Sequence, residues 1–245
     1  MGTAQGRTPG GRQPRRCAVC GASLDDGRCP ACLLALALGS GDDEVAGSDT
    51  SPSGPAYRVR TVIAQGPGRT LYLAEETPAR RLVTLDVTSS RGADAPAEFQ
   101  ERLRRLKQLV HPSIARVRDG RIIESGEFCV VADHVAGPRV DRYCHRQGLG
   151  PDDRAALFGR VCAAIAFAHG LDAPHGRLSA EAVVISGTDG AASPVVTLFG
   201  MWTDRVPSAR DDLDALRVLA AHLGVGEVPA ARAALGALCR PRTSR

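Results

Sequence analysis

The chain has 245 residues, of which 43% are hydrophobic and 4% aromatic, so it can bury a core made mainly of Leu, Val and Ala. Its net charge of +4 identifies no partner. The longest apolar runs, 31–38 and 161–168, are too short to cross a bilayer, which takes about 20 residues. The polar N-terminus also lacks the apolar segment of a signal peptide. We therefore expect a cytoplasmic protein with no membrane partner.

The first 56 residues differ in composition from the rest of the chain. Residues 1–16 form a basic tail of Gly, Arg, Pro and Gln, which we expect to be disordered. Residues 17–38 contain four cysteines and form a small module. Residues 39–56 have the Gly, Ser and Asp content of a flexible linker. A larger domain is expected over 57–245.

The cysteine module has the spacing of a zinc site. Two C-x-x-C pairs are separated by eight residues, and each pair can turn two thiolates towards one ion. Sixteen residues are too few to fold without a metal, which favours zinc over a redox pair or a fortuitous cluster. The predicted ligands of this structural zinc are Cys17, Cys20, Cys29 and Cys32.

The domain from residue 57 onwards starts with strands and continues with helices. The predicted strands are 57–64, 70–75, 81–87, 114–118 and 126–133. The predicted helices are 95–109, 154–169, 211–223 and 229–239. This order predicts an α+β domain with two lobes, a small β-rich lobe over about 57–133 and a helical lobe over about 138–245.

Several segments give this domain a resemblance to bacterial serine/threonine protein kinases. His111–Ile114 is similar to the H-P-N-I motif of that family, and 130–137 resembles the hinge between its lobes. The segment 175–184 is similar to the catalytic loop, H-R-D-x-K-x-x-N, and 195–200 is similar to the segment that ends in D-F-G. The resemblance implies the two-lobed protein-kinase fold, with a reduced helical lobe because only eleven residues separate Gly200 from Asp212.

The positions that carry the chemistry of the family are changed. The catalytic aspartate is replaced by Arg177, the metal-binding asparagine by Ala182 and the aspartate of D-F-G by Leu198. Phosphoryl transfer uses these groups to orient the nucleophile and to hold magnesium. The glycine-rich loop, at Gly66 and Gly68, is degenerate, so ATP and magnesium are not expected as cofactors.

The conserved lysine–glutamate pair of the family also has no counterpart of the same charge. An acidic residue, Asp86, stands at the position of the phosphate-binding lysine. Arg102 stands at the position of the helix glutamate, which predicts a charge-reversed pair between Asp86 and Arg102. The alternative is that Glu101 is the counterpart after a one-residue slip and that both charges are solvated.

The positions that build the fold of the family are retained. The resemblance places Leu106, His175 and Phe199 in the apolar spine between the lobes. It assigns to Asp212 the carboxylate that holds the backbone of the catalytic loop.

These observations lead to three hypotheses for the function. The first is a catalytically inactive kinase-like protein, a pseudokinase, which is not an enzyme and regulates an unidentified protein partner. The second is a divergent active kinase that uses other carboxylates. The third is a nucleic-acid-binding protein that uses the zinc module and the basic tail. The carboxylates of the second hypothesis are Asp133, Asp204, Asp211 and Asp214, and the arginines of the third are Arg7, Arg12, Arg15 and Arg16.

Overall fold

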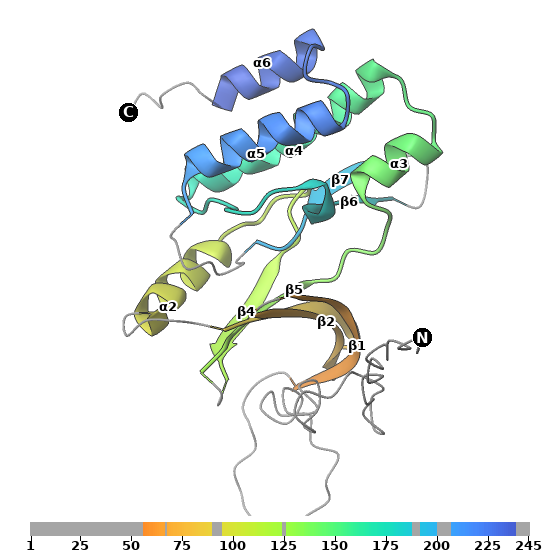
Figure 1. Cartoon of the computed structure of the whole chain (residues 1–245). Coiled ribbons are helices and arrows are strands. Elements are labelled where there is room, and N and C mark those ends of the chain that lie inside the picture. Colours follow the sequence, from red (N-terminus) through yellow and green to blue (C-terminus); the bar gives the residue numbers. More distant parts are fainter. Residues whose placement is uncertain are drawn as a thin grey trace, which may run out of the picture.

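The computed structural model describes residues 56–66, 68–89, 95–123, 126–187, 192–199 and 207–238. The predicted basic tail, the four cysteines of the zinc module and nearly all of the linker lie outside these residues. The described chain forms a sheet lobe and a helical lobe, with helix α2 beside the sheet and between the two (Figure 1).

The sheet lobe contains five antiparallel strands in the order β1-β2-β3-β5-β4. The strands are β1 (Ala56–Gly66), β2 (Arg69–Thr77), β3 (Arg81–Thr88), β4 (Val117–Ile122) and β5 (Phe128–Asp133). The turn between β1 and β2 contains Gly68, whose φ of 65° favours a residue without Cβ. The predicted strand over 114–118 is wrong in its position, because β4 begins at Val117 and Ile114 only bridges to Val196.

Alternation along the strands gives the sheet two different faces. Val83, Leu85 and Val87 of β3 belong to a core cluster on one face, together with Cys129 and Val131 of β5. Successive side chains of a strand point to opposite faces. The intervening residues of β3 and β5 therefore face the helical lobe.

Helix α2 (Ala95–Leu106) presents the apolar stripe that the sequence predicts. Phe99, Leu103 and Leu106 are buried, and the Phe99 ring stacks on Phe128 of β5 with 4.5 Å between centroids. The helix ends three residues before Leu109, which is nevertheless fully buried. These side chains belong to the core cluster that also includes the helical lobe.

The helical lobe is built around α4 (Pro151–Gly170), whose proline start and acidic first turn agree with the predicted start signal. Helix α5 (Ala209–His222) begins with a capping box between Ser208 and Asp211, and α6 (Pro229–Leu238) follows it. Four short elements were not predicted from the sequence, of which one is the 3-10 helix Ala180–Ala182 and the other three are longer. These three are α3 (Val140–Arg146) and the two strands of a hairpin, β6 (Val183–Ser186) and β7 (Ser193–Val196).

No helix among the described residues is long and apolar enough to cross a membrane.

Candidate functional site

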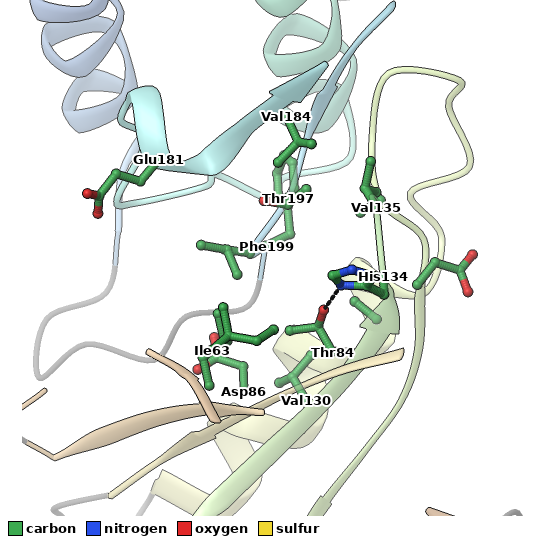
Figure 2. Close-up of a pocket in the computed structure, with 15 residues that line it drawn as sticks. Ile63, Thr84, Asp86, Val130, His134, Val135, Glu181, Val184, Thr197 and Phe199 are labelled. Carbon is green, nitrogen blue, oxygen red and sulfur yellow. Dashed lines mark hydrogen bonds between the residues drawn. The ribbon is translucent and has the colours of Figure 1, made fainter. Parts of the chain in front are cut away.

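A pocket lies between the two lobes, with a cavity of about 130 Å³. Figure 2 shows Thr84, Asp86 and Val130 on the sheet side of this pocket, and Thr197 and Phe199 on the opposite side. The remaining lining residues are mostly apolar, namely Ile63, Leu71, Ala115, Ala132, Val135, Val184 and Leu198, with Asp133, His134 and Glu181 at polar positions. The cavity is smaller than the roughly 300–1,000 Å³ of pockets for drug-sized ligands, so it would enclose only part of a ligand of that size.

Strand alternation explains which side chains reach the pocket. Thr84 and Asp86 of β3 face it because they alternate with the buried apolar residues of the other face. The Thr84 hydroxyl lies 3.3 Å from Nδ1 of His134, which follows β5 (Figure 2). The pocket therefore has a polar corner beside the segment that joins the lobes.

Asp86 pairs with Arg69 of β2. Nε of Arg69 donates to Oδ1 at 2.7 Å and Nη2 donates to Oδ2 at 3.0 Å, a fork-to-fork geometry. Burial raises the pKa of Asp86 above its usual value, and the hydrogen bonds and charge of Arg69 oppose that increase. The contact with Arg69 thus stabilises a buried carboxylate in a part of the pocket that is otherwise lined mostly by apolar side chains.

The predicted contact between Asp86 and Arg102 is not formed. Arg102 instead donates from Nη2 to the carbonyl oxygen of Pro174 in the helical lobe, at 3.2 Å. Burial lowers the pKa of Arg102, and the nearby Asp212 carboxylate opposes this decrease. The alternative counterpart, Glu101, is exposed and pairs on its own helix with Arg104 and Arg105. Neither helix charge pairs with Asp86, whose partner is Arg69 on the adjacent strand β2.

The structure places His175 and Phe199 in contact, with ring centroids 4.7 Å apart in an edge-to-face arrangement. Nε2 of His175 donates to the carbonyl oxygen of Thr197 at 2.8 Å. Burial lowers the pKa of His175, which favours the neutral ring. Leu106 lies in the same core cluster as Phe199. These residues join α2 to the two loops at the base of the pocket.

Asp212 is fully buried at the start of α5 and accepts three hydrogen bonds. Oδ2 accepts from the backbone N–H of His175 at 2.8 Å and from Nε2 of His169 at 2.7 Å, and Oδ1 accepts from the N–H of Gly176 at 2.7 Å. The two backbone contacts are those that the resemblance assigns to this residue. His169 was missed, because a histidine at the end of an apolar helix gives no sequence signal of its role.

The three changed positions lie around the same loops. Arg177 is exposed and follows Gly176, whereas Ala182 is buried in the core cluster against which Leu198 packs. Leu198 lines the pocket with a φ of 64°, which is uncommon for a residue with a Cβ. No group of three or more His, Cys, Asp or Glu side chains able to hold a metal occurs in the described part of the chain.

No model of a known protein family matches the chain. The serine/threonine-protein kinase PkaA of Streptomyces coelicolor is 32% identical over 127 residues, which are 51% of this chain and 23% of that protein. The serine/threonine-protein kinase PknE of Mycobacterium tuberculosis is 28% identical over 137 residues, 54% of this chain and 24% of that protein. The chain thus spans about a quarter of the length of these relatives.

Solved structures show the fold. The kinase domain of PknI from Mycobacterium tuberculosis matches with a TM-score of 0.57 and 21% identity, over 76% of this chain and 79% of that domain. Rad53 residues 1–466 in complex with AMP-PNP match with a TM-score of 0.55 and 20% identity, over 70% of this chain and 47% of that one. The described chain has the α+β, protein-kinase-like fold that the sequence predicts.

The comparisons correct one expectation. From its sequence the chain was expected not to be an enzyme, whereas the matching bacterial relatives are named serine/threonine-protein kinases and the structural neighbours are kinase domains. The expectation was wrong because it rested on four substituted positions, Asp86, Arg177, Ala182 and Leu198, and gave less weight to the similarity of the surrounding chain.

Proposed function

We propose that the chain is a divergent serine/threonine protein kinase domain that binds a nucleotide in the pocket between its lobes. The observation that carries this proposal is the pocket itself. It lies between the sheet of the kinase-like fold and the loops of His175 and Phe199, and mostly apolar side chains line it. An apolar slot with a few polar groups at its edge is the usual form of a site for a small ring compound.

The base of the nucleotide would lie between Val130 and Ala132 on the sheet side and Val184 on the other. The Thr84–His134 corner offers a hydroxyl and a ring nitrogen at the edge of the slot. The backbone N–H of Val135, in the segment that joins the lobes, donates to no backbone group among the described residues. We propose that this N–H group donates a hydrogen bond to an acceptor atom at the edge of the bound base.

Phosphoryl transfer depends mainly on positioning and on neutralising the charge of the transferred group. A carboxylate must also orient the attacking hydroxyl. Asp86 and Asp133 are held in bidentate pairs with Arg69 and Arg118. Glu181 has a side chain that is 71% exposed, and its partner in the described chain is the partly exposed Arg139. We therefore assign the role of orienting the hydroxyl to Glu181.

The test is a transfer assay on the full chain with labelled ATP, magnesium or manganese, and generic protein substrates. We expect incorporation above a heat-killed control and its loss in Glu181→Gln. The matched control is Asp214→Asn, an exposed carboxylate on α5 that pairs with Arg217. Absence of incorporation in the unmodified protein, or equal incorporation in Glu181→Gln, would contradict the assignment.

Nucleotide binding is tested separately by thermal unfolding, because a ligand that binds the native state raises the melting temperature by mass action. Ala132→Phe would fill the slot next to Val130, and Val218→Phe adds the same ring on an exposed part of α5. We expect ATP to stabilise the unmodified protein and the Val218 variant but not the Ala132 variant. Equal stabilisation of all three proteins would place the ligand elsewhere.

We also propose a structural zinc ion in the N-terminal module and a protein partner for the chain. The spacing of the four cysteines supports the metal, as four thiolates around one ion can fold a segment of that length.

A further inference from the structure

Three charged side chains gather where the pocket meets the start of β2. Asp86 lines the pocket and accepts two hydrogen bonds from Arg69. The side chain of Arg69 is 20% exposed. Arg177 is exposed on the loop that follows His175, and it is close enough to lower the pKa of Asp86. Arg69 in turn is close enough to lower the pKa of His175. Asp86 is therefore hydrogen-bonded to one guanidinium group, that of Arg69, and lies in the electrostatic field of a second, that of Arg177.

Arg69 and Asp86 form a pair with two parallel hydrogen bonds. A guanidinium presents two parallel N–H donors that fit two oxygens of a carboxylate or of a phosphate equally well. Burial raises the pKa of Asp86, so a carboxyl group released from Arg69 can take up a proton and remain in the pocket wall without a charge. A phosphate that carries more charge can compete with it.

Among the described residues at the metal-binding positions of kinases, no side chain could hold a metal ion that neutralises a phosphate. Ala182 and Leu198, which replace the metal-binding residues of kinases, have side chains without oxygen or nitrogen. With Asp86 at −1 and Arg69 and Arg177 at +1 each, the formal charges at the mouth of the pocket sum to +1. Displacing Asp86 from Arg69 would leave both arginines free to face an anion.

We propose that a phosphate of the bound nucleotide is held directly by Arg69 and Arg177, without a metal ion, and that it displaces Asp86 from Arg69. Asp86 then acts as an internal competitor of the ligand. This inference rests on the proposed nucleotide site, and it adds how that site recognises phosphate and what opposes it.

The experiment is calorimetric titration of the full chain with ADP and with adenosine, each in EDTA and in magnesium. We expect ADP to bind at least tenfold more tightly than adenosine, as one hydrogen bond to a charged group allows. We expect this ratio to be the same in EDTA and in magnesium. Asp86→Asn should raise the affinity for ADP at least tenfold and leave the affinity for adenosine unchanged.

Two variants remove the proposed contacts. Arg177→Gln is on an exposed side chain and should reduce the preference for ADP without loss of stability. Arg69→Lys keeps the positive charge but loses the two parallel N–H donors, and should also reduce the preference for ADP over adenosine. Adenosine binding reports whether each variant is folded. Arg104→Gln, an exposed arginine of α2 paired with Glu101, is the control and should change neither affinity.

The possible failures are distinguishable. If adenosine and ADP bind equally, if ADP binding is lost in EDTA, or if Asp86→Asn has no effect, the phosphate contact is refuted and the nucleotide pocket stands. If neither compound binds under any condition, both the pocket and the phosphate contact are refuted.

Discussion

The carboxylate of Asp212 is the contact whose removal tests the arrangement of the loops most directly. In Asp212→Ala, the backbone N–H groups of His175 and Gly176 lose the acceptor that lies 2.7–2.8 Å away. A buried donor left without a partner costs about 1–3 kcal/mol. Two such donors predict a loss of about 2–6 kcal/mol, a large part of the roughly 5–15 kcal/mol that stabilises a typical domain.

The assay is urea unfolding of the full chain, with the midpoint and the slope fitted for each variant. Asp214→Ala is the matched control, because its side chain is 62% exposed and pairs with Arg217 on the same helix. An exposed pair of this kind contributes about 0.2–1 kcal/mol at most. Asp212→Asn keeps one oxygen acceptor but points an amide at the second donor, so we expect a loss between those of the two alanine variants. Equal losses below about 0.5 kcal/mol at both positions would refute the reasoning.

Three further predictions concern the zinc module, the pair in the pocket and one close backbone approach. Metal analysis of the purified full chain should find about one zinc per chain, and the zinc should be lost in a Cys17→Ser, Cys29→Ser double variant; unchanged zinc would exclude the site. In a denaturation double-mutant cycle, Arg69→Gln and Asp86→Asn should couple by about 0.5–3 kcal/mol, whereas strict additivity would mean that the pair contributes nothing. Gly137→Ala should destabilise strongly, because the added Cβ would lie 2.0 Å from the carbonyl oxygen of Ile185. Gly159→Ala in α4 meets no atom within 4 Å and should be neutral or stabilising; similar effects of both alanines would contradict the clash.

Periodicity predicted the longer elements of the fold well. The alternation of β3 and the apolar face of α4 are strong signals, because each extends over several repeats. Helix α3 has only seven residues, and β6 and β7 have four each, so none of them contains enough repeats to be recognised. Their positions depend on packing against the rest of the helical lobe.

The partner of Asp86 was missed although the sequence contained the information. The prediction followed the kinase pattern from strand to helix and therefore chose Arg102. The antiparallel register pairs Arg69 with Thr88 and Leu71 with Asp86, which makes Arg69 and Asp86 diagonal neighbours on one face. Two consecutive strands joined by a short turn predict such a neighbour. The conformation of Leu198, in contrast, is imposed by the surrounding fold and has no signal in the sequence.

The two core clusters do not coincide with the two lobes. The buried side chains of α2 belong to the same core cluster as those of α4 and α5. Arg102 also donates to the carbonyl oxygen of Pro174, and Arg105 pairs with Asp172. The second cluster lies on the far face of the sheet and includes Tyr57 and Tyr72 of the β1–β2 hairpin. Segments of a native protein unfold locally in cooperative units, which are set by packing and need not coincide with the lobes of the fold. In native-state hydrogen exchange, the amides of β1 should therefore open at lower free energy than those of α2, which should open together with the helical lobe.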